Sequence, residues 1–142
     1  MTFTTPQDPQ WNPLLEAAWR ARDCAYAPYS HFHVGAALLD RNGTLHTGCN
    51  VENASYGGTI CAERNAICAA AAQGMRPGDM LALVVVTEAE TLTPPCGLCR
   101  QVIAEFAEDL PILLANRQGR SLHSISELLP HAFTGRNLVD PA

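Results

Sequence analysis

The stretch LALVVV, residues 81–86, is a continuous apolar run of strand length. Apolar residues without polar alternation are expected where a β-strand is covered on both of its faces. We therefore predict that residues 81–86 form a central strand, in a sheet that carries helices on both sides.

Helical segments are predicted on each side of this strand in the sequence. Residues 59–73 are rich in alanine and are followed by Gly74, which is typical of a helix that ends in a C-terminal glycine. Residues 97–106 follow Pro95 and have apolar positions that define one buried face. The small side chains of the first helix would let it pack closely on the sheet.

The N-terminal part of the chain predicts one more helix and a β-hairpin. Apolar residues recur at helical spacing from Asn12 to Tyr26, until Pro28 interrupts the pattern. Residues 34–39 and 45–51 are two strand-like runs separated by a turn that contains Asn42-Gly43, a pair that supplies positive φ angles. These two runs should pair antiparallel.

The C-terminal part predicts two strands and a short helix. Residues 112–115 are strand-like, and after a turn a second short run continues through His123. Ser124 and Glu127 have the spacing of a capping box that opens a last helix. The resulting order, α-β-β-α-β-α-β-β-α, predicts an α/β protein: a three-layer α/β/α sandwich with a five-stranded mixed sheet, formed by residues 1–142 as a single domain.

Composition and charge limit the partners that the protein can bind. The 142 residues include 9 Lys and Arg against 14 Asp and Glu, which gives a formal net charge of -5, and no run of basic residues occurs. We therefore expect no nucleic acid and no membrane as partner, and a small neutral ligand instead. The N-terminal residues lack the pattern of an export signal, so we expect a cytoplasmic protein with reduced thiols.

Three of the six cysteines are candidates for metal ligands. Cys61 lies at the start of one predicted helix, and Cys96 and Cys99 lie at the start of the next. Helix N-termini stabilise thiolates, and three thiolates suit a tetrahedral zinc ion whose fourth position is left to water. The other cysteines, Cys24, Cys49 and Cys68, are predicted to be buried in the core, because free cysteine is among the most buried residue types.

Glu63 is the candidate general acid and base. It follows Cys61 by two residues, so it need not bind the metal ion but can reach a water molecule bound there. The pattern Cys61-Ala62-Glu63, together with Pro95-Cys96-Gly97-Leu98-Cys99, resembles the three-cysteine form of the zinc deaminase signature. This resemblance implies that hydroxide attacks C4 of a cytosine ring while Glu63 transfers protons.

Further blocks of sequence resemble one family, the small homotetrameric cytidine deaminases, over nearly the whole chain. These blocks are PYSHF at residues 28–32, GCNVENASY at 48–56, CAERNAI at 61–67, PCGLCRQ at 95–101 and ELLP at 127–130. The resemblance implies one zinc ion per subunit, hydrolysis of cytidine and 2′-deoxycytidine in pyrimidine salvage, and a homotetramer whose sites are completed by neighbouring subunits.

The same resemblance implies roles for individual residues. Asn50 and Glu52 would bind the ribose hydroxyls, Phe32 would line the base pocket, and the main chain of Ala62 would contact the pyrimidine edge. Tyr56 and Phe133 would be the aromatic residues by which one subunit completes the site of another. Arg64 would donate hydrogen bonds to the ligating sulfurs. One departure is His33, where many members carry proline, and it leaves the shape of that loop open.

Other readings of the same residues remain open at this point. The thiols could form a redox pair beside a buried cysteine, although Glu63 and Arg64 would then have no role. A deaminase of a cytosine-bearing antibiotic such as blasticidin S would carry similar zinc blocks. Polynucleotide editing is disfavoured, because the first ligand is Cys61 rather than histidine and no basic channel is evident. A non-catalytic zinc-stapled module would need a fourth protein ligand.

Overall fold

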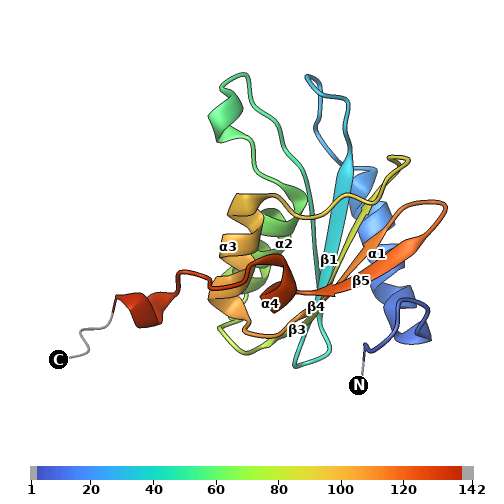
Figure 1. The fold of residues 1–142 in the computed structure, drawn as a ribbon. Helices are drawn as coiled ribbons and strands as arrows, with labels where there is room; N and C mark the ends of the chain where they lie inside the picture. Colours follow the sequence, from blue (N-terminus) through green and yellow to red (C-terminus); the bar gives the residue numbers. More distant parts are fainter. Residues whose placement is uncertain (1–2, 139–142) are drawn as a thin grey trace.

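A five-stranded mixed sheet forms the centre of the protein, in a computed structural model that describes residues 3–138 (Figure 1). The strand order is β2-β1-β3-β4-β5, with β3 parallel to β4 and every other neighbouring pair antiparallel. The strands are β1 (Val34–Asp40), β2 (Leu45–Cys49), β3 (Met80–Thr87), β4 (Pro111–Ala115) and β5 (Arg120–Ser124). The ends of the expected 1–142 domain, residues 1–2 and 139–142, lie outside the described residues.

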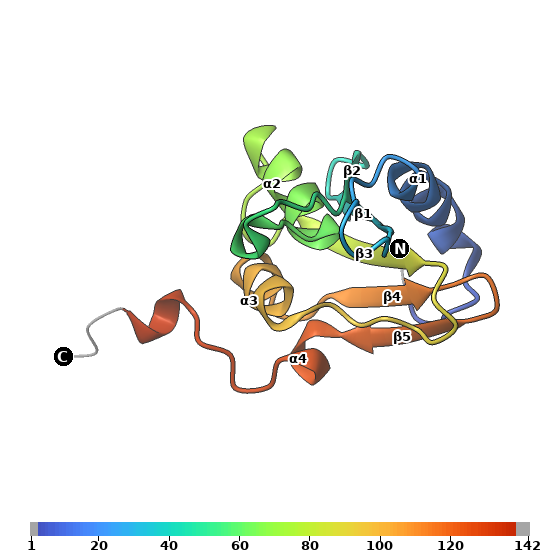
Figure 2. The same ribbon diagram turned by 90° about the horizontal axis from the view of Figure 1, so that it is seen from above.

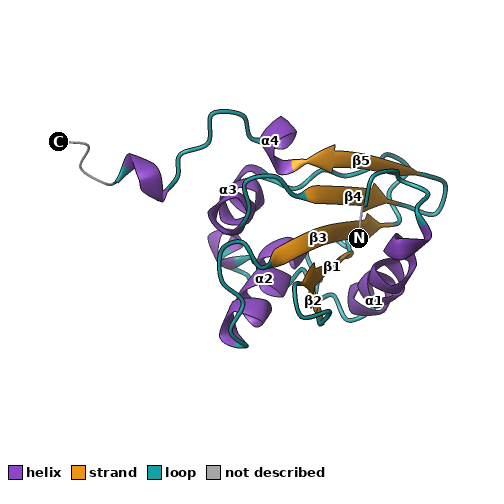
Figure 3. Cartoon of the chain, turned by 90° about the horizontal axis from the view of Figure 1, so that it is seen from below, coloured by secondary structure: helices purple, strands orange, loops and turns teal. Residues whose placement is uncertain are grey.

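Helices cover both faces of this sheet, which confirms the predicted three-layer α/β/α sandwich (Figures 2 and 3). The helices are α1 (Asn12–Arg22), α2 (Ala62–Ala72), α3 (Gly97–Phe106) and α4 (Ile125–Leu128), with short 3-10 turns η1 (Pro9–Trp11), η2 (Tyr56–Gly58) and η3 (Gly135–Asn137). The core between α1 and the sheet is separate from the core between the sheet and α2 with α3. None of the helices among residues 3–138 is long and apolar enough to cross a lipid bilayer.

Strand β3 lies in the middle of the sheet, as the run LALVVV predicts. Its residues alternate between the two cores: Leu83 and Val85 pack under α2 and α3, whereas Val84 and Val86 pack under α1. Because both faces of β3 are buried, the strand has no solvent-facing polar positions along most of its length.

The first helix is shorter than the sequence predicts. α1 ends at Arg22, and Asp23 and Cys24 turn the chain away from the helix axis. Tyr26, expected to be the last helical residue, instead forms an isolated parallel bridge with Val51, in which the Tyr26 N–H donates to the Asn50 carbonyl over 3.0 Å. This pairing joins residues far apart in the sequence, so helical periodicity could not reveal it.

The hairpin between β1 and β2 forms with the predicted antiparallel pairing, but by a different turn. Only Gly43 has a positive φ, of 82°, whereas both Asn42 and Gly43 were expected to adopt one. The Asp40 carboxylate instead organises the turn, because its Oδ1 accepts hydrogen bonds from the N–H groups of Asn42 (2.9 Å) and Thr44 (3.0 Å).

The prediction that Cys24, Cys49 and Cys68 are core residues is wrong. Cys24 and Cys68 are exposed, and Cys49 is half-buried at the end of β2. Cys68 lies on the outer side of α2, where alanines occupy both faces of the helix, so the sequence of α2 does not distinguish the buried side from the exposed one.

Replacing Gly35 by alanine should destabilise the fold by about 1–3 kcal/mol, because overpacking a tight contact forces backbone shifts. A Cβ atom at Gly35 would lie 2.0 Å from the Ala18 carbonyl oxygen of α1, so only glycine allows α1 to approach β1 this closely. Urea denaturation gives the change in unfolding free energy. Gly119→Ala is the matched control, since its Cβ would meet open space. Equal stability of the two variants would contradict the close α1–β1 contact.

The buried Asp40–His46 pair should make stability depend on acid pH. His46 Nε2 lies 2.9 Å from Asp40 Oδ2, and this hydrogen bond, with help from the turn N–H groups, lowers the pKa of Asp40. A carboxyl group whose pKa is lower in the native state than in the unfolded state stabilises the fold at pH values above its unfolded pKa, which is near 4. This stabilisation is lost as the pH falls through the native pKa. We expect Asp40→Ala to lose about 1–3 kcal/mol at pH 7.

The test compares unfolding free energies of the wild type and Asp40→Ala between pH 7 and pH 3, with exposed Glu105→Ala as control. The difference between wild type and Asp40→Ala should narrow below about pH 4. A difference that stays constant over this range would show that the charge of Asp40 contributes nothing to stability.

Candidate active site

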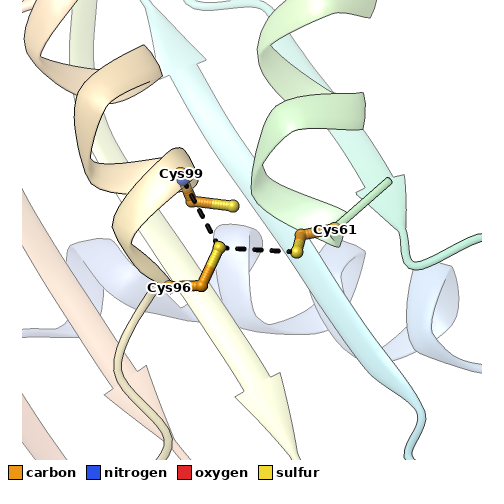
Figure 4. Close-up of side chains that lie close together, drawn as sticks. All are labelled: Cys61, Cys96 and Cys99. Atoms are coloured by element: carbon orange, nitrogen blue, oxygen red, sulfur yellow. Dashed lines mark hydrogen bonds between the residues drawn. The ribbon is translucent and has the colours of Figure 1, made fainter. Parts of the chain in front are cut away.

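Two helix N-termini bring three thiols together, as Figure 4 shows. Cys61 precedes α2, Cys96 precedes α3, and Cys99 lies in the first turn of α3. The Sγ atoms of Cys61 and Cys96 are 3.7 Å apart, and all three Sγ atoms lie within 4.8 Å of one another. The Cys99 N–H donates to Cys96 Sγ over 3.5 Å, so the first turn of α3 also orients Cys96.

The sheet topology explains why these two helices begin at one place. Strands β2 and β3 are both antiparallel to β1, so they run in the same direction and end at the same edge of the sheet. The chain after β2 pairs once more, through a bridge between Val51 and Ile60, immediately before Cys61. The loop after β3 then returns to the same edge and delivers Cys96.

The thiol cluster has the chemistry and spacing of a zinc site. In a tetrahedral site with Zn–S bonds of about 2.3 Å, neighbouring sulfurs are roughly 3.8 Å apart, close to the observed 3.7 Å between Cys61 and Cys96. Among residues 3–138, no fourth side chain joins this ligand group. Three protein ligands with one position left for water is the arrangement of a catalytic zinc site rather than a structural one.

The groups around the cluster favour a thiolate at Cys61. The pKa of Cys61 is lowered to about 5, first by a hydrogen bond from Cys99 and also by Arg64, whereas the pKa of Cys99 is raised because its proton is shared with the Cys61 thiolate. Arg64 Nη2 lies 3.6 Å from Cys61 Sγ and 3.4 Å from the Thr59 carbonyl oxygen. The guanidinium and the two helix N-termini thus offset the negative charge that three thiolates would carry.

Glu63 lies in the first turn of α2 and is only 4% exposed. Burial, with a smaller contribution from the negative charge of the Cys61 thiolate, raises the pKa of its carboxyl group to about 7. A carboxyl group with a pKa near neutrality can both accept and donate a proton at pH 7. Ala62, between Cys61 and Glu63, is fully buried.

Glu52 lines a hollow of about 270 Å³ that is connected to the thiol site through Thr59, whose carbonyl contacts the same Arg64 group as the Cys61 sulfur. The hollow is lined by Tyr29, Ser30, Glu52, Tyr56 and Thr59. The rings of Tyr29 and Tyr56 contact each other edge to face, with centroids 5.9 Å apart. In Figure 1 the loop that carries η2 and the loop before β1 project from the same edge of the sheet.

Asn50 and Phe32 are brought together, although not as free ligand-binding groups. The buried Asn50 side chain donates from Nδ2 to the Phe32 carbonyl over 2.7 Å and accepts at Oδ1 from the Val34 N–H over 2.9 Å. Asn50 therefore fixes the backbone on both sides of His33, and the Phe32 ring itself remains partly exposed.

The two aromatic residues expected to complete a neighbouring site are both exposed. Tyr56 is 75% and Phe133 is 58% exposed. The Phe133 carbonyl accepts a 2.7 Å hydrogen bond from Gln101 Nε2 of α3, and residues 134–138 extend away from the sheet (Figure 2).

Sequence reasoning did not assign a role to Arg100, which ties the Cys96 loop to α4. Its Nε donates to the Pro95 carbonyl and its Nη1 to the Leu128 carbonyl, each over 2.8 Å. The available signal was a charged residue directly after Cys99, which is unusual on a helix that packs on a core. Ser30, which contacts Glu52, was likewise missed.

Fold and site together define a class: an α/β protein in which three thiols could hold a zinc ion and leave one metal position to water. The pattern of the family described as "Cytidine and deoxycytidylate deaminase zinc-binding region" matches residues 10–113, which include all three thiols and Glu63. The chain belongs to this family, and zinc is its metal cofactor.

Similar proteins carry the same family name. The chain is 48% identical to a cytidine deaminase from Halalkalibacterium halodurans over 129 residues, which cover 89% of this chain and 96% of that protein. It resembles a crystal structure of cytidine deaminase from Burkholderia pseudomallei with a TM-score of 0.83 and 51% identity, over 86% of this chain and 98% of that one. A blasticidin-S deaminase from Bacillus cereus is 29% identical over 85% of this chain and 90% of that protein.

Proposed function

We propose that the protein hydrolyses cytidine and 2′-deoxycytidine to uridine and 2′-deoxyuridine with release of ammonia. The observation that carries this proposal is the juxtaposition of three thiols with the buried carboxyl of Glu63 at two helix N-termini. Three thiols that leave one metal position to water suit a catalytic metal ion, and a buried proton-transferring group beside them suits hydrolysis.

Cys61, Cys96 and Cys99 would hold one zinc ion per subunit, with Arg64 donating to the Cys61 sulfur. When bound, zinc acidifies water so that it can act as a nucleophile near neutral pH. The Glu63 carboxylate accepts a proton from the attacking water and delivers it to ring nitrogen 3. The carboxylate then takes the remaining proton from the hydroxyl group now on C4 and gives it to the amino group, which leaves as ammonia. The reaction thus consumes one water molecule and forms the carbonyl of uridine.

The nucleoside would lie between the thiol site and the hollow beside Glu52. We assign the sugar hydroxyls to Glu52, with Asn50 holding the loop next to them, and the base to Phe32 and the main chain of Ala62. Support comes from the position of the hollow, which includes both Glu52 and Thr59, two residues before Cys61.

We further propose a cytoplasmic homotetramer that acts in pyrimidine salvage, in which Tyr56 and Phe133 complete the site of a neighbouring subunit. Both aromatic residues are exposed, and large exposed apolar side chains near a site are typical of an interface. A blasticidin S substrate is less well supported, because the cytidine deaminases are more similar to this chain than the blasticidin-S deaminase is.

The test is the ultraviolet absorbance of cytidine mixed with the purified protein, beside an identical sample stripped of metal by a chelator. The cytosine band should disappear in the first sample and persist in the second, and added zinc should restore the activity of the second. If a zinc-loaded sample leaves cytidine unchanged, the proposal is wrong, and blasticidin S is then the substrate to examine.

A further inference from the structure

The Ser30 hydroxyl connects the two parts of the nucleoside site. It donates a short hydrogen bond to Glu52 Oε2, and it accepts a 3.0 Å hydrogen bond from the N–H of Phe32. Glu52 borders the hollow assigned to the sugar, and Phe32 is assigned to the base. One hydroxyl group therefore contacts a residue of each subsite.

Among residues 3–138, the hydrogen bonds to the Glu52 carboxylate come from two adjacent residues, Tyr29 and Ser30. The N–H groups of Tyr29 (2.9 Å) and Ser30 (3.1 Å) both donate to Oε1, and the Ser30 hydroxyl donates to Oε2. The Ser30 hydroxyl is the main cause that lowers the pKa of Glu52, so the side chain stays ionised at neutral pH. An ionised carboxylate only accepts hydrogen bonds, and its free capacity on Oε2 therefore suits a ligand that donates, such as a sugar hydroxyl.

The Phe32 backbone is fixed at both of its polar groups. Its N–H donates to Ser30, and its carbonyl accepts from Asn50 Nδ2. Between Ser30 and Phe32, His31 adopts a left-handed conformation with a φ of 58°, which is uncommon for residues other than glycine. The Ser30–Phe32 hydrogen bond closes this turn, together with a 3.0 Å bond from the His31 N–H to the Ala27 carbonyl.

We propose that Ser30 is a positioning residue that fixes the Glu52 carboxylate relative to the Phe32 backbone. The groups that bind the sugar and the base of one nucleoside then keep a fixed position relative to each other. This inference rests on the proposed function, because it takes Glu52 as the group that receives the sugar hydroxyl. It predicts that removing the Ser30 hydroxyl weakens recognition of the sugar hydroxyls specifically.

The first test measures the position of Glu52 without using activity. NMR of the glutamate side-chain carboxyls across an acid titration should show a higher pKa for Glu52 in Ser30→Ala than in the wild type. Ser30→Thr, which keeps a hydroxyl, should restore the lower pKa. An unchanged pKa in Ser30→Ala would overturn the proposal.

The second test compares two substrates, cytidine and 2′,3′-dideoxycytidine, which lacks the sugar hydroxyls. Ser30→Ala should lower kcat/KM for cytidine roughly tenfold, mostly through KM, as expected for a lost hydrogen bond to a charged group. For the dideoxy substrate the loss should stay below about twofold, the size of an ordinary surface substitution. Ser126→Ala, which removes an exposed hydroxyl that forms a 3.0 Å hydrogen bond with the Ser124 hydroxyl, is the matched control.

The outcomes of these tests distinguish a failure of the Ser30 proposal from a failure of the proposed function. An equal loss on both substrates would mean that Ser30 only stabilises the loop, and the proposal would be overturned. If the wild type deaminates neither substrate, the proposed function is wrong, and the Glu52 titration alone then decides whether Ser30 holds this carboxylate.

Discussion

Glu63→Gln should lower kcat for cytidine about 10²–10⁴-fold, the usual contribution of a general acid and base. Glutamine has nearly the same shape as glutamate but cannot accept and return a proton at this position. The carboxyl group of Glu63 is buried beside the thiols with a pKa raised to about 7 by that burial, so its environment favours proton transfer rather than a solvated charge.

Zinc content, measured by elemental analysis of the purified variant, is the control for Glu63→Gln. It should equal that of the wild type, because Glu63 does not join the ligand group. Near-normal turnover with full zinc occupancy would remove Glu63 from the mechanism. Loss of zinc together with activity would instead assign Glu63 to the metal site.

Cys96→Ala should abolish detectable turnover and strongly reduce bound zinc. A site with three protein ligands that loses one of them retains two, too few for stable catalytic coordination. Cys96 is exposed and lies before α3 rather than inside it, so its replacement by alanine creates no core cavity. Metal analysis and the cytidine absorbance assay together give the result.

Cys68→Ala is the matched control for this variant, because Cys68 is also an exposed cysteine and lies on α2, two turns after Cys61. It should retain both zinc and activity. Comparable loss of zinc in Cys68→Ala and Cys96→Ala would mean that zinc binding is not specific to the thiol cluster, and would contradict the assignment of this cluster as the metal site.

Local sequence patterns were sufficient for most of the fold. The apolar run in β3 and the segment Gly97–Phe106 of α3 form as predicted, and so does the order of elements. Helix α2 ends before Gly74 as expected but begins at Ala62 rather than at residue 59, because Ile60 pairs with Val51. Such patterns report the backbone conformation that a segment prefers and whether the segment as a whole is apolar, and both properties are largely local. The predicted C-terminal end of α1 was wrong, because Tyr26 pairs with Val51 instead of continuing the helix. This contact forms only when the sheet is in place.

In the candidate site, too, the sequence identified some residues, and only the structure revealed the contacts of others. Spacing and residue type singled out Cys61, Cys96, Cys99 and Glu63, because thiols at helix starts beside a carboxylate are chemically distinctive. The burial of the other cysteines was predicted wrongly, since the side of a helix that faces the core is set by packing against other elements. No pattern in the sequence predicts the hydrogen bonds from Ser30 to Glu52 and between Asp40 and His46.

The sequence by itself therefore determined the order of the elements, the buried central strand and the candidate metal-binding residues. The tertiary structure alone decided which residues meet: two thiols 35 positions apart at 3.7 Å, and Ser30 with a carboxylate 22 positions away. The physical reason is that local preferences depend on neighbours along the chain. Contacts between distant residues depend on strand register and helix packing, which arise only when the whole sheet has formed.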